Sequence, residues 1–205
     1  MNTLAGERLY LADDTELGVT GNPDPVVCRR HVARYDKAIA LAHTTNGTWL
    51  DFACGSGYGT AMIAKVAELV VGIDRDPIAI RYAVRNHDHP NCFYRVAAES
   101  EVWSIMGLHL RPDVVVCIET LEHMDLAMQG YYTQAVARGL APGGVFVLAC
   151  PIGNGLSSAN PWHIHEPTLE FLNAMLGANF KDVSIATEAY TSTSGPATQA
   201  WAVCR

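Results

Sequence analysis

Asp74 has the clearest chemical context of any side chain in this sequence, because it ends the apolar run at residues 69–74. It follows, by about 20 residues, a turn that carries glycine at alternate positions, namely Gly55, Gly57 and Gly59. Glycine lets a ligand approach the backbone closely, and the N–H groups that open the following helix favour acceptor or anionic ligand atoms. A carboxylate at the tip of the next strand is placed to accept both hydroxyls of a ribose. The glycine turn alone could be a tight structural connection, but together with Asp74 it predicts a nucleoside pocket.

The composition is that of a globular protein with an acidic balance. Of the 205 residues, 49% are hydrophobic and 17% charged, and the formal net charge is −7 without a basic run. This balance disfavours a large phosphate-binding surface, so we do not expect a nucleic-acid partner. No apolar run approaches the roughly 20 residues of a membrane span, and residues 1–11 lack the apolar core of a signal peptide. The six cysteines include no Cys-x-x-Cys pair, so we expect a reduced, cytoplasmic protein without membrane contact, disulfides or structural zinc.

The elements that would position the pocket alternate between strands and helices. Residues 1–27 are interpreted as an irregular leader or a lid, because Gly and Pro recur there, and residues 28–205 as a single domain. Apolar strands separated by helices predict an α/β fold with a doubly wound sheet and helices on both faces. The last two strands have no crossover helix between them, so they should pair antiparallel in a seven-stranded, Rossmann-like sheet. Strands are expected near 49–52, 69–74, 92–96, 112–118, 145–150, 180–189 and 197–204, and helices include 28–42, 101–108, 126–140 and 167–177.

Taken in order, the motifs resemble those of the class I S-adenosylmethionine-dependent methyltransferases. The stretch at 51–57 (Asp-Phe-Ala-Cys-Gly-Ser-Gly) is similar to the family's first motif, and the strand at 70–74 to its second. Residues 113–123 are similar to the fourth-strand signature of the small-molecule branch, and 140–144 (Leu-Ala-Pro-Gly-Gly) to the turn before the fifth strand. The resemblance runs from Thr48 to the C-terminus. It implies S-adenosylmethionine as cofactor and transfer of its methyl group to a small-molecule or sugar-type acceptor.

Three shorter stretches carry a narrower resemblance, to a bacterial subgroup associated with glycan or natural-product biosynthesis. They are residues 6–9 (Gly-Glu-Arg-Leu), 31–35 (His-Val-Ala-Arg-Tyr) and 160–163 (Asn-Pro-Trp-His).

The family resemblance implies a set of cofactor contacts, carried over position by position. Asp51 would reach the amino group of the methionine moiety, directly or through water, and Asp74 would hold the ribose hydroxyls. Arg75 would flank the adenine, and Glu119 would face the sulfonium region. The family often has Asp where this chain has Ala97, which leaves the adenine amino group to a neighbouring side chain or a backbone carbonyl. The remaining contacts would come from the backbone at Ala53, Cys54, Gly55 and Gly57 and, at the edge of the adenine, from Ala98 and Glu99.

The candidate catalytic residues are His123 and His163, with Glu122 and His165 as further candidate bases. His123 follows the fourth strand, where it is either a base or a polar loop residue that orients the next segment. His163 lies in the loop 151–166, whose Gly, Ser, Asn and Pro content suggests a substrate loop. His163 and His165 lack a third ligand of known position, so we expect no metal site. The side chains able to grip a polar acceptor are Arg8, His31, Tyr35, Trp162 and His163.

Three other functional classes compete with this interpretation. A nicotinamide-dependent oxidoreductase would use a similar sheet, but its Gly-x-Gly-x-x-Gly spacing differs from that of the turn at 55–59. A nucleic-acid or nucleotide methyltransferase is disfavoured by the acidic charge. A cofactor-binding protein without transfer activity stays open, because the pocket is specified better than any acceptor site.

Overall fold

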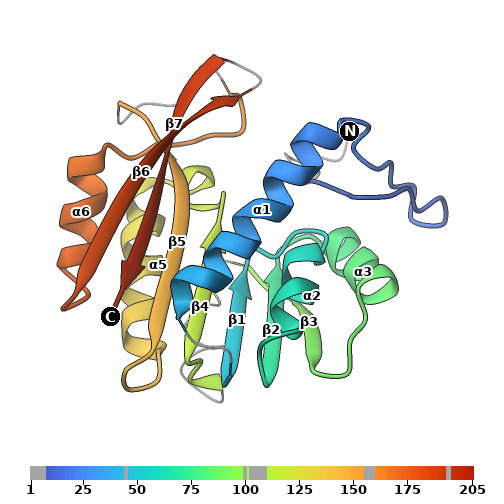
Figure 1. Ribbon diagram of the computed structural model, residues 1–205, viewed down its shortest axis with the longest axis horizontal. Coiled ribbons are helices and arrows are strands. Elements are labelled where there is room, and N and C mark those ends of the chain that lie inside the picture. The colour runs from blue at the N-terminus through green and yellow to red at the C-terminus, as the bar shows by residue number, and fades with distance from the viewer. Residues whose placement is uncertain (1–7, 44–45, 99–100, 102–109, 155–159, 193–194) are drawn as a thin grey trace. The chain divides into compact units, whose positions relative to one another are not determined.

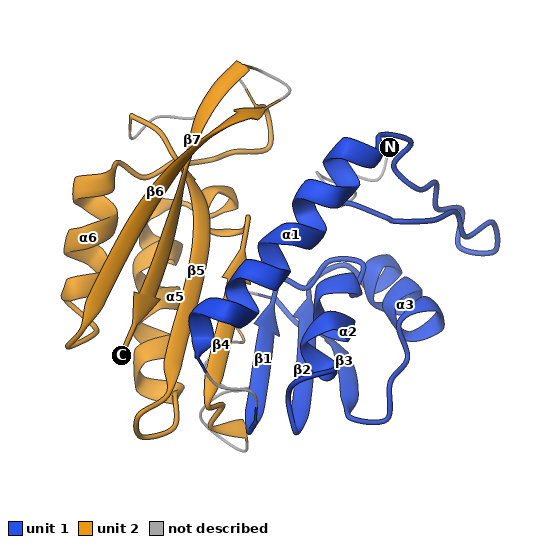
Figure 2. Cartoon of the chain, in the orientation of Figure 1, with its two compact units in different colours: residues 1–98 blue, residues 99–205 orange. Residues whose placement is uncertain are grey.

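The computed structural model describes residues 8–43, 46–98, 101, 110–154, 160–192 and 195–205 (Figure 1). The chain divides into two compact units, residues 1–98 and 99–205 (Figure 2). The helix predicted at 101–108 lies, apart from its first residue, outside the described residues, as do Gly6, Glu7 and Glu99.

Unit 1 is a parallel three-stranded sheet with the strand order β3-β2-β1. Short helices connect its strands, as the alternating pattern predicts. In β1, the four residues Trp49, Leu50, Asp51 and Phe52 are all buried. Burial of successive residues means that both faces of this strand are covered. The elements are α1 (Pro25–Ala42), β1 (Thr48–Phe52), α2 (Tyr58–Ala64), β2 (Leu69–Asp74), α3 (Pro77–Asn86) and β3 (Cys92–Val96).

The first helix, α1, begins at Pro25, three residues earlier than the predicted start at Cys28. Asp24 caps it by accepting hydrogen bonds from the N–H groups of Val26 and Val27, and Pro25 occupies the first turn. A proline at this position has no N–H to lose and already has a helical φ angle. Pro25 was counted among the prolines that keep residues 1–27 irregular, and this was wrong, because the non-helical leader ends at Asp24.

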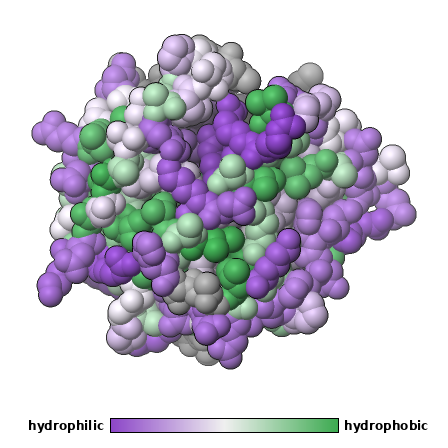
Figure 3. All heavy atoms as spheres, in the orientation of Figure 1, coloured by the Kyte–Doolittle hydropathy of each residue, from purple (hydrophilic) through white to green (hydrophobic). Residues whose placement is uncertain are grey.

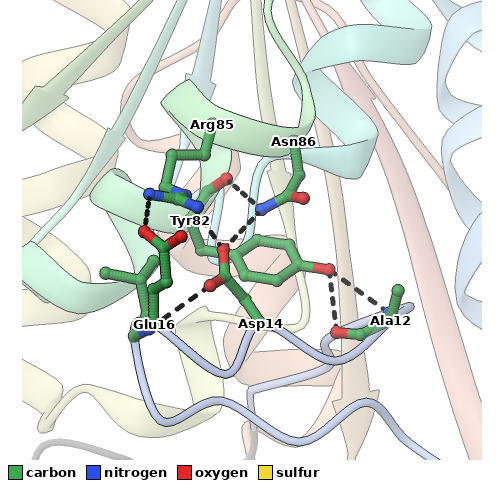
Figure 4. Close-up of polar contacts among 7 residues, drawn as sticks. Ala12, Asp14, Glu16, Tyr82, Arg85 and Asn86 are labelled. Carbon is green, nitrogen blue, oxygen red and sulfur yellow. Dashed lines mark hydrogen bonds and ion pairs between the residues drawn. The ribbon is translucent and has the colours of Figure 1, made fainter.

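The described part of the leader lies against α3 through polar contacts (Figure 4). The Tyr82 hydroxyl accepts a hydrogen bond from the Ala12 N–H at 3.2 Å and donates one to the Ala12 carbonyl at 3.0 Å. Arg85 forms ion pairs with Asp14 at 3.2 Å and with Glu16 at 2.7 Å. The leader is thus attached to the helix that directly follows Asp74 and Asp76.

Unit 2 has the strand order β4-β5-β7-β6. Strands β4 and β5 are parallel, whereas β7 pairs antiparallel with both β5 and β6. The predicted antiparallel C-terminal hairpin is confirmed, with its first strand starting later than expected, at Val183. The elements are β4 (Val114–Ile118), the 3-10 helix η3 (Leu121–His123), α5 (Leu126–Gly139), β5 (Val145–Ile152), α6 (Leu169–Gly177), β6 (Val183–Ser192) and β7 (Gly195–Cys204).

The seven strands and their connecting helices confirm the predicted α/β class with an antiparallel C-terminal strand. The visible face of the molecule carries polar residues interspersed with apolar ones (Figure 3). Among the described residues, no helix combines the length and apolar character needed to cross a membrane.

Candidate functional site

Asp74 and the glycine turn lie together in unit 1, as the sequence predicts. The Asp74 carboxylate accepts a hydrogen bond from the Gly55 N–H at its Oδ2 atom, at 3.0 Å. Its Oδ1 atom accepts the N–H of Asp76 at 2.8 Å. The contact arises because β1 and β2 are parallel neighbours with Phe52 opposite Ile73, so that the residues after each strand meet at one edge.

The backbone of the turn takes left-handed φ angles at three positions. Gly55 has φ 54° and Gly57 has φ 85°, and Ala53 has φ 58° although it carries a side chain. A Cβ atom at Gly57 would lie 2.5 Å from the Cβ of Ala83 and 2.9 Å from the Tyr94 ring, whereas one at Gly55 would meet nothing within 4 Å. Gly57 thus serves packing, and Gly55 leaves open space beside Asp74. A non-glycine residue in this conformation is strained, and such strain concentrates at functional sites.

Asp51 is fully buried beneath the turn. Its Oδ1 atom accepts the Tyr35 hydroxyl at 3.1 Å, and its Oδ2 atom accepts the Thr60 hydroxyl at 2.6 Å. Burial raises the pKa of Asp51 to about 7, and the hydrogen bonds from Thr60 and Tyr35 oppose that shift. The two hydroxyls therefore hold this carboxylate in place, and its contact with a methionine amino group stays a prediction.

Arg8 and Tyr35 occupy positions that the sequence did not indicate. Both were predicted to grip the acceptor. That role stays a prediction, and the structure shows other contacts: Arg8 forms ion pairs with Asp74 at 2.8 Å and Asp76 at 3.4 Å, and Tyr35 donates to Asp51. The reason for both is charge compensation, since buried carboxylates need donors or cations nearby. The two carboxylates at positions 74 and 76 indicate that a cationic side chain lies nearby. The sequence alone could not predict which arginine would form the ion pair.

The other predicted cofactor residues are placed as follows. Cys54 is buried, and its N–H donates to the Ile73 carbonyl at 2.9 Å. Arg75 is exposed and Ala98 is partly exposed. In unit 2, Glu119 has φ 51°, and its Oε1 atom accepts a hydrogen bond from Gln199 at 2.7 Å.

The two predicted catalytic histidines lie together in unit 2. Their rings are 5.2 Å apart in an edge-to-face arrangement. Glu122, His123 and His163 each offer one ligand atom, and these atoms lie within 4.8 Å of one another. Glu122 was predicted as an alternative base to the histidines, whereas the structure joins all three residues in one cluster, here called the Glu–His cluster.

Buried polar contacts hold this cluster together. The N–H groups of Ile164 and His165 donate to the Glu122 carbonyl at 2.8 and 3.1 Å, which attaches the loop after β5 to η3. Gln129 of α5 is fully buried, and its amide donates to the carbonyls of Leu121 and His165, both at 2.9 Å. A buried amide that joins two segments specifies their relative position.

Comparison with known proteins identifies the class. Residues 27–183 match the family model described as a methyltransferase domain. The chain belongs to this family, as its motifs predict.

Particular relatives extend this finding. A curated protein of Mycolicibacterium smegmatis, called a probable S-adenosylmethionine-dependent methyltransferase, is 31% identical over 154 residues, which are 72% of this chain and 56% of the relative. The chain thus spans little more than half the length of that protein. The solved structure of N-methyltransferase NodS from Bradyrhizobium japonicum, in complex with S-adenosylhomocysteine, matches with TM-score 0.68 and 18% identity, covering 93% of this chain and 95% of that one.

The same fold also occurs in a protein with a different reaction in its name. The [4+2]-cyclase SpnF matches with TM-score 0.63 and 14% identity, covering 85% of this chain and 82% of that one. At such identities the structural matches show the fold alone, so the reaction must be argued from the site.

Proposed function

We propose that this protein binds S-adenosylmethionine and transfers its methyl group to a small-molecule or sugar-type acceptor. The contact between the Asp74 carboxylate and the Gly55 N–H carries the proposal. Through this contact, a carboxylate able to accept ribose hydroxyls lies beside a glycine turn that has open space at Gly55. A nucleoside needs this arrangement. The family match supports the choice of cofactor.

The acceptor capacity of Asp74 limits how a ribose can bind. An ionised carboxylate offers about four lone-pair sites, and Asp74 uses three of them for the N–H groups of Gly55 and Asp76 and for Arg8. One ribose hydroxyl can be accepted without rearrangement. A second hydroxyl requires Arg8 to leave the Oδ1 atom.

The cofactor supplies an activated methyl group on its sulfonium, and the protein supplies alignment and proton acceptance. In the Glu–His cluster, the His123 Nδ1 atom lies 2.9 Å from the Trp162 carbonyl. A carbonyl can only accept, so Nδ1 carries the proton and Nε2 is the basic nitrogen. His123 is therefore oriented to take a proton from an acceptor hydroxyl or amine.

A small or sugar-type acceptor is favoured over a nucleic acid by charge. The net charge of −7 and the lack of a basic run would repel a polyphosphate backbone. The experiments below also distinguish this function from the alternative, a cofactor-binding protein without transfer activity.

The test begins with isothermal titration of the purified protein with S-adenosylhomocysteine, with NAD as the comparison ligand. We expect binding of the first only, and saturation at about 100 times Kd should stabilise the fold by roughly 2.7 kcal/mol. Absence of both heat and thermal shift at millimolar S-adenosylhomocysteine would refute the cofactor assignment.

The acceptor class is tested with methyl-labelled S-adenosylmethionine and panels of saccharides, small alcohols and amines, tRNA and DNA. Label in the saccharide or small-molecule fractions supports the proposal, and label in the nucleic acids contradicts it. Cofactor binding without label in any fraction favours the binding-protein alternative. With an acceptor found, His163→Ala should lower turnover while cofactor affinity stays within about twofold, because acceptor alignment acts on the transfer step.

A further inference from the structure

The Glu–His cluster contains three side chains of the types that bind transition metals. Glu122 directly precedes His123 in η3, and His163 comes from the loop after β5. One ligand atom of each lies within 4.8 Å of the other two. In the sequence, His163 and His165 have no third ligand of known position, but the fold brings Glu122 and His123 of η3 to His163.

Each histidine of the cluster is held by an acceptor at its Nδ1 atom. The Trp162 carbonyl lies 2.9 Å from Nδ1 of His123. The Glu166 Oε1 atom lies 2.5 Å from Nδ1 of His163. Both contacts place the ring proton on Nδ1, which makes Nε2 of each ring the lone-pair nitrogen. Metal-binding histidines are oriented in the same way, by a carboxylate or a carbonyl on the nitrogen that does not bind the metal.

Glu122 adds a buried carboxyl group to the two imidazoles. Its exposure is 1%, and a carboxylate removed from water is costly unless a donor or a cation compensates it. His163 is also shielded, with a side-chain exposure of 12%. A divalent cation between the three side chains would therefore meet one buried carboxylate and one shielded imidazole.

We propose that Glu122, His123 and His163 bind one first-row divalent transition-metal ion of the zinc class. Imidazole nitrogens select such ions over Mg²⁺ and Ca²⁺, which prefer oxygen ligands. Two histidines and one carboxylate are a ligand set of zinc sites that keep a position open for water or substrate. The three ligand atoms now lie within 4.8 Å of one another. Metal–ligand bonds of about 2.1 Å require these separations to shorten when the ion binds.

One existing contact must yield when the ion binds. The Asn160 amide nitrogen lies 3.0 Å from Nε2 of His163, while its Oδ1 atom accepts the N–H of Trp162 at 3.1 Å. The amide therefore donates to the same lone pair that the ion would take. This contact supports the assignment of Nε2 as the lone-pair nitrogen, and its loss is part of the cost of metal binding.

The cation site stands on the geometry of unit 2 alone, whereas its use in methyl transfer rests on the proposed function. An ion held by the three residues would coordinate an acceptor hydroxyl and lower its pKa. With the ion bound, Nε2 of His123 would be a ligand and could not also act as the base named in the proposed function, so the proton of that hydroxyl would leave to solvent.

The experiment uses the full chain without a histidine tag, treated with a chelator and desalted. Titration with Co²⁺ should produce the visible absorption of a nitrogen-coordinated ion at one equivalent, and Zn²⁺ should abolish it, whereas Mg²⁺ should not. Zn²⁺ should also raise the melting temperature of the chelator-treated protein. Glu122→Gln, His123→Ala and His163→Ala should each weaken Co²⁺ binding at least about tenfold, and Glu166→Gln by about 10- to 100-fold, since it orients His163.

His165→Ala is the matched control, because His165 lies on the same loop but its ring contacts Gln129 and Phe171 instead. This variant should bind Co²⁺ like the wild type. The proposal is overturned if the wild type shows neither Co²⁺ absorption nor a Zn²⁺-dependent thermal shift, or if the cluster variants bind as the control does. Titration of the same samples with S-adenosylhomocysteine separates this failure from a failure of the proposed function, because the nucleoside pocket of unit 1 contains none of these ligands.

Discussion

Replacing Asp74 with Asn changes the proposed nucleoside pocket with the least change in side-chain size. The carboxylate accepts hydrogen bonds at both oxygens, from Gly55 at Oδ2 and from Asp76 and Arg8 at Oδ1. An amide has only one oxygen, so its NH₂ group must face at least one of these donors. We expect the amide nitrogen to face Gly55, because the opposite orientation would meet two donors.

Two magnitudes follow for Asp74→Asn. An unsatisfied buried donor costs about 1–3 kcal/mol. Because the hydrogen bond from the Gly55 N–H is part-buried, the free energy of unfolding should fall by at most that amount. A ribose hydroxyl that loses a hydrogen bond to a charged group loses about 1.5–3 kcal/mol. Affinity for S-adenosylhomocysteine should therefore fall by about tenfold to a hundredfold.

The assay is isothermal titration at a temperature where circular dichroism shows the variant to be folded. Asp76→Asn is the matched control, because it removes the neighbouring charge that also faces Arg8 at 3.4 Å. Asp76 caps α3 by accepting the Ile78 N–H at 2.8 Å, and Asn caps helices about equally well, so stability should be kept and affinity should stay within about twofold. Equal losses of affinity in the two variants would refute the reasoning, since they would show that general negative charge, rather than the acceptor atoms of Asp74, holds the ligand.

Two further predictions concern stability. The pKa of Asp51 is raised to about 7 from its usual 3.8, so between these pH values the folded state keeps a proton that the unfolded state has released, and stability should fall as pH rises through this window. Asp51→Asn should remove that slope and gain about 2–3 kcal/mol relative to the wild type between pH 5 and pH 8 in urea unfolding, whereas parallel profiles would contradict the burial argument. Gly59→Ala would place a Cβ atom 2.0 Å from the Tyr35 ring, so it should destabilise the protein by about 1–3 kcal/mol. Gly130→Ala in α5 meets nothing within 4 Å and should stabilise by about 0.5–1 kcal/mol; a similar loss in both variants would show that close packing on Tyr35 is not the cause.

The fold could be predicted from the sequence because its signals are local. The run at 69–74 is apolar up to Asp74 and matches β2. The strand predicted at 112–118 is observed two residues shorter, starting at Val114. The absence of a crossover helix between the last two strands was enough to predict β6 and β7 as an antiparallel pair. Pro25 was misinterpreted because the same residue breaks a helix interior and favours a helix start, and Asp24 decided between the two.

The site could be predicted only where one motif contains both partners or where two adjacent parallel strands end together. Gly55 and Asp74 meet for the second reason. Arg8 reaches Asp74 across 66 positions in the sequence, and His123 meets the Trp162 carbonyl across 39. No periodicity or spacing encodes such distances, because they depend on how the intervening chain packs. The same limit kept Glu122, His123 and His163 apart as alternatives in the sequence, although they form one cluster in the structure.

Arg8 of the leader occupies the carboxylate that we propose as the acceptor of the ribose hydroxyls. Arg8 and the Asp76 N–H together saturate the Oδ1 atom, and the Gly55 N–H leaves a single lone pair on Oδ2. Two ribose hydroxyls and Arg8 therefore cannot all bind this carboxylate at once. Because the leader is attached to α3 at Tyr82 and Arg85, a shift of Arg8 can occur while those contacts remain. In the proposed function, Arg8 is thus the group that a fully bound ribose must displace, and the interpretation of residues 1–27 as a lid stays a prediction.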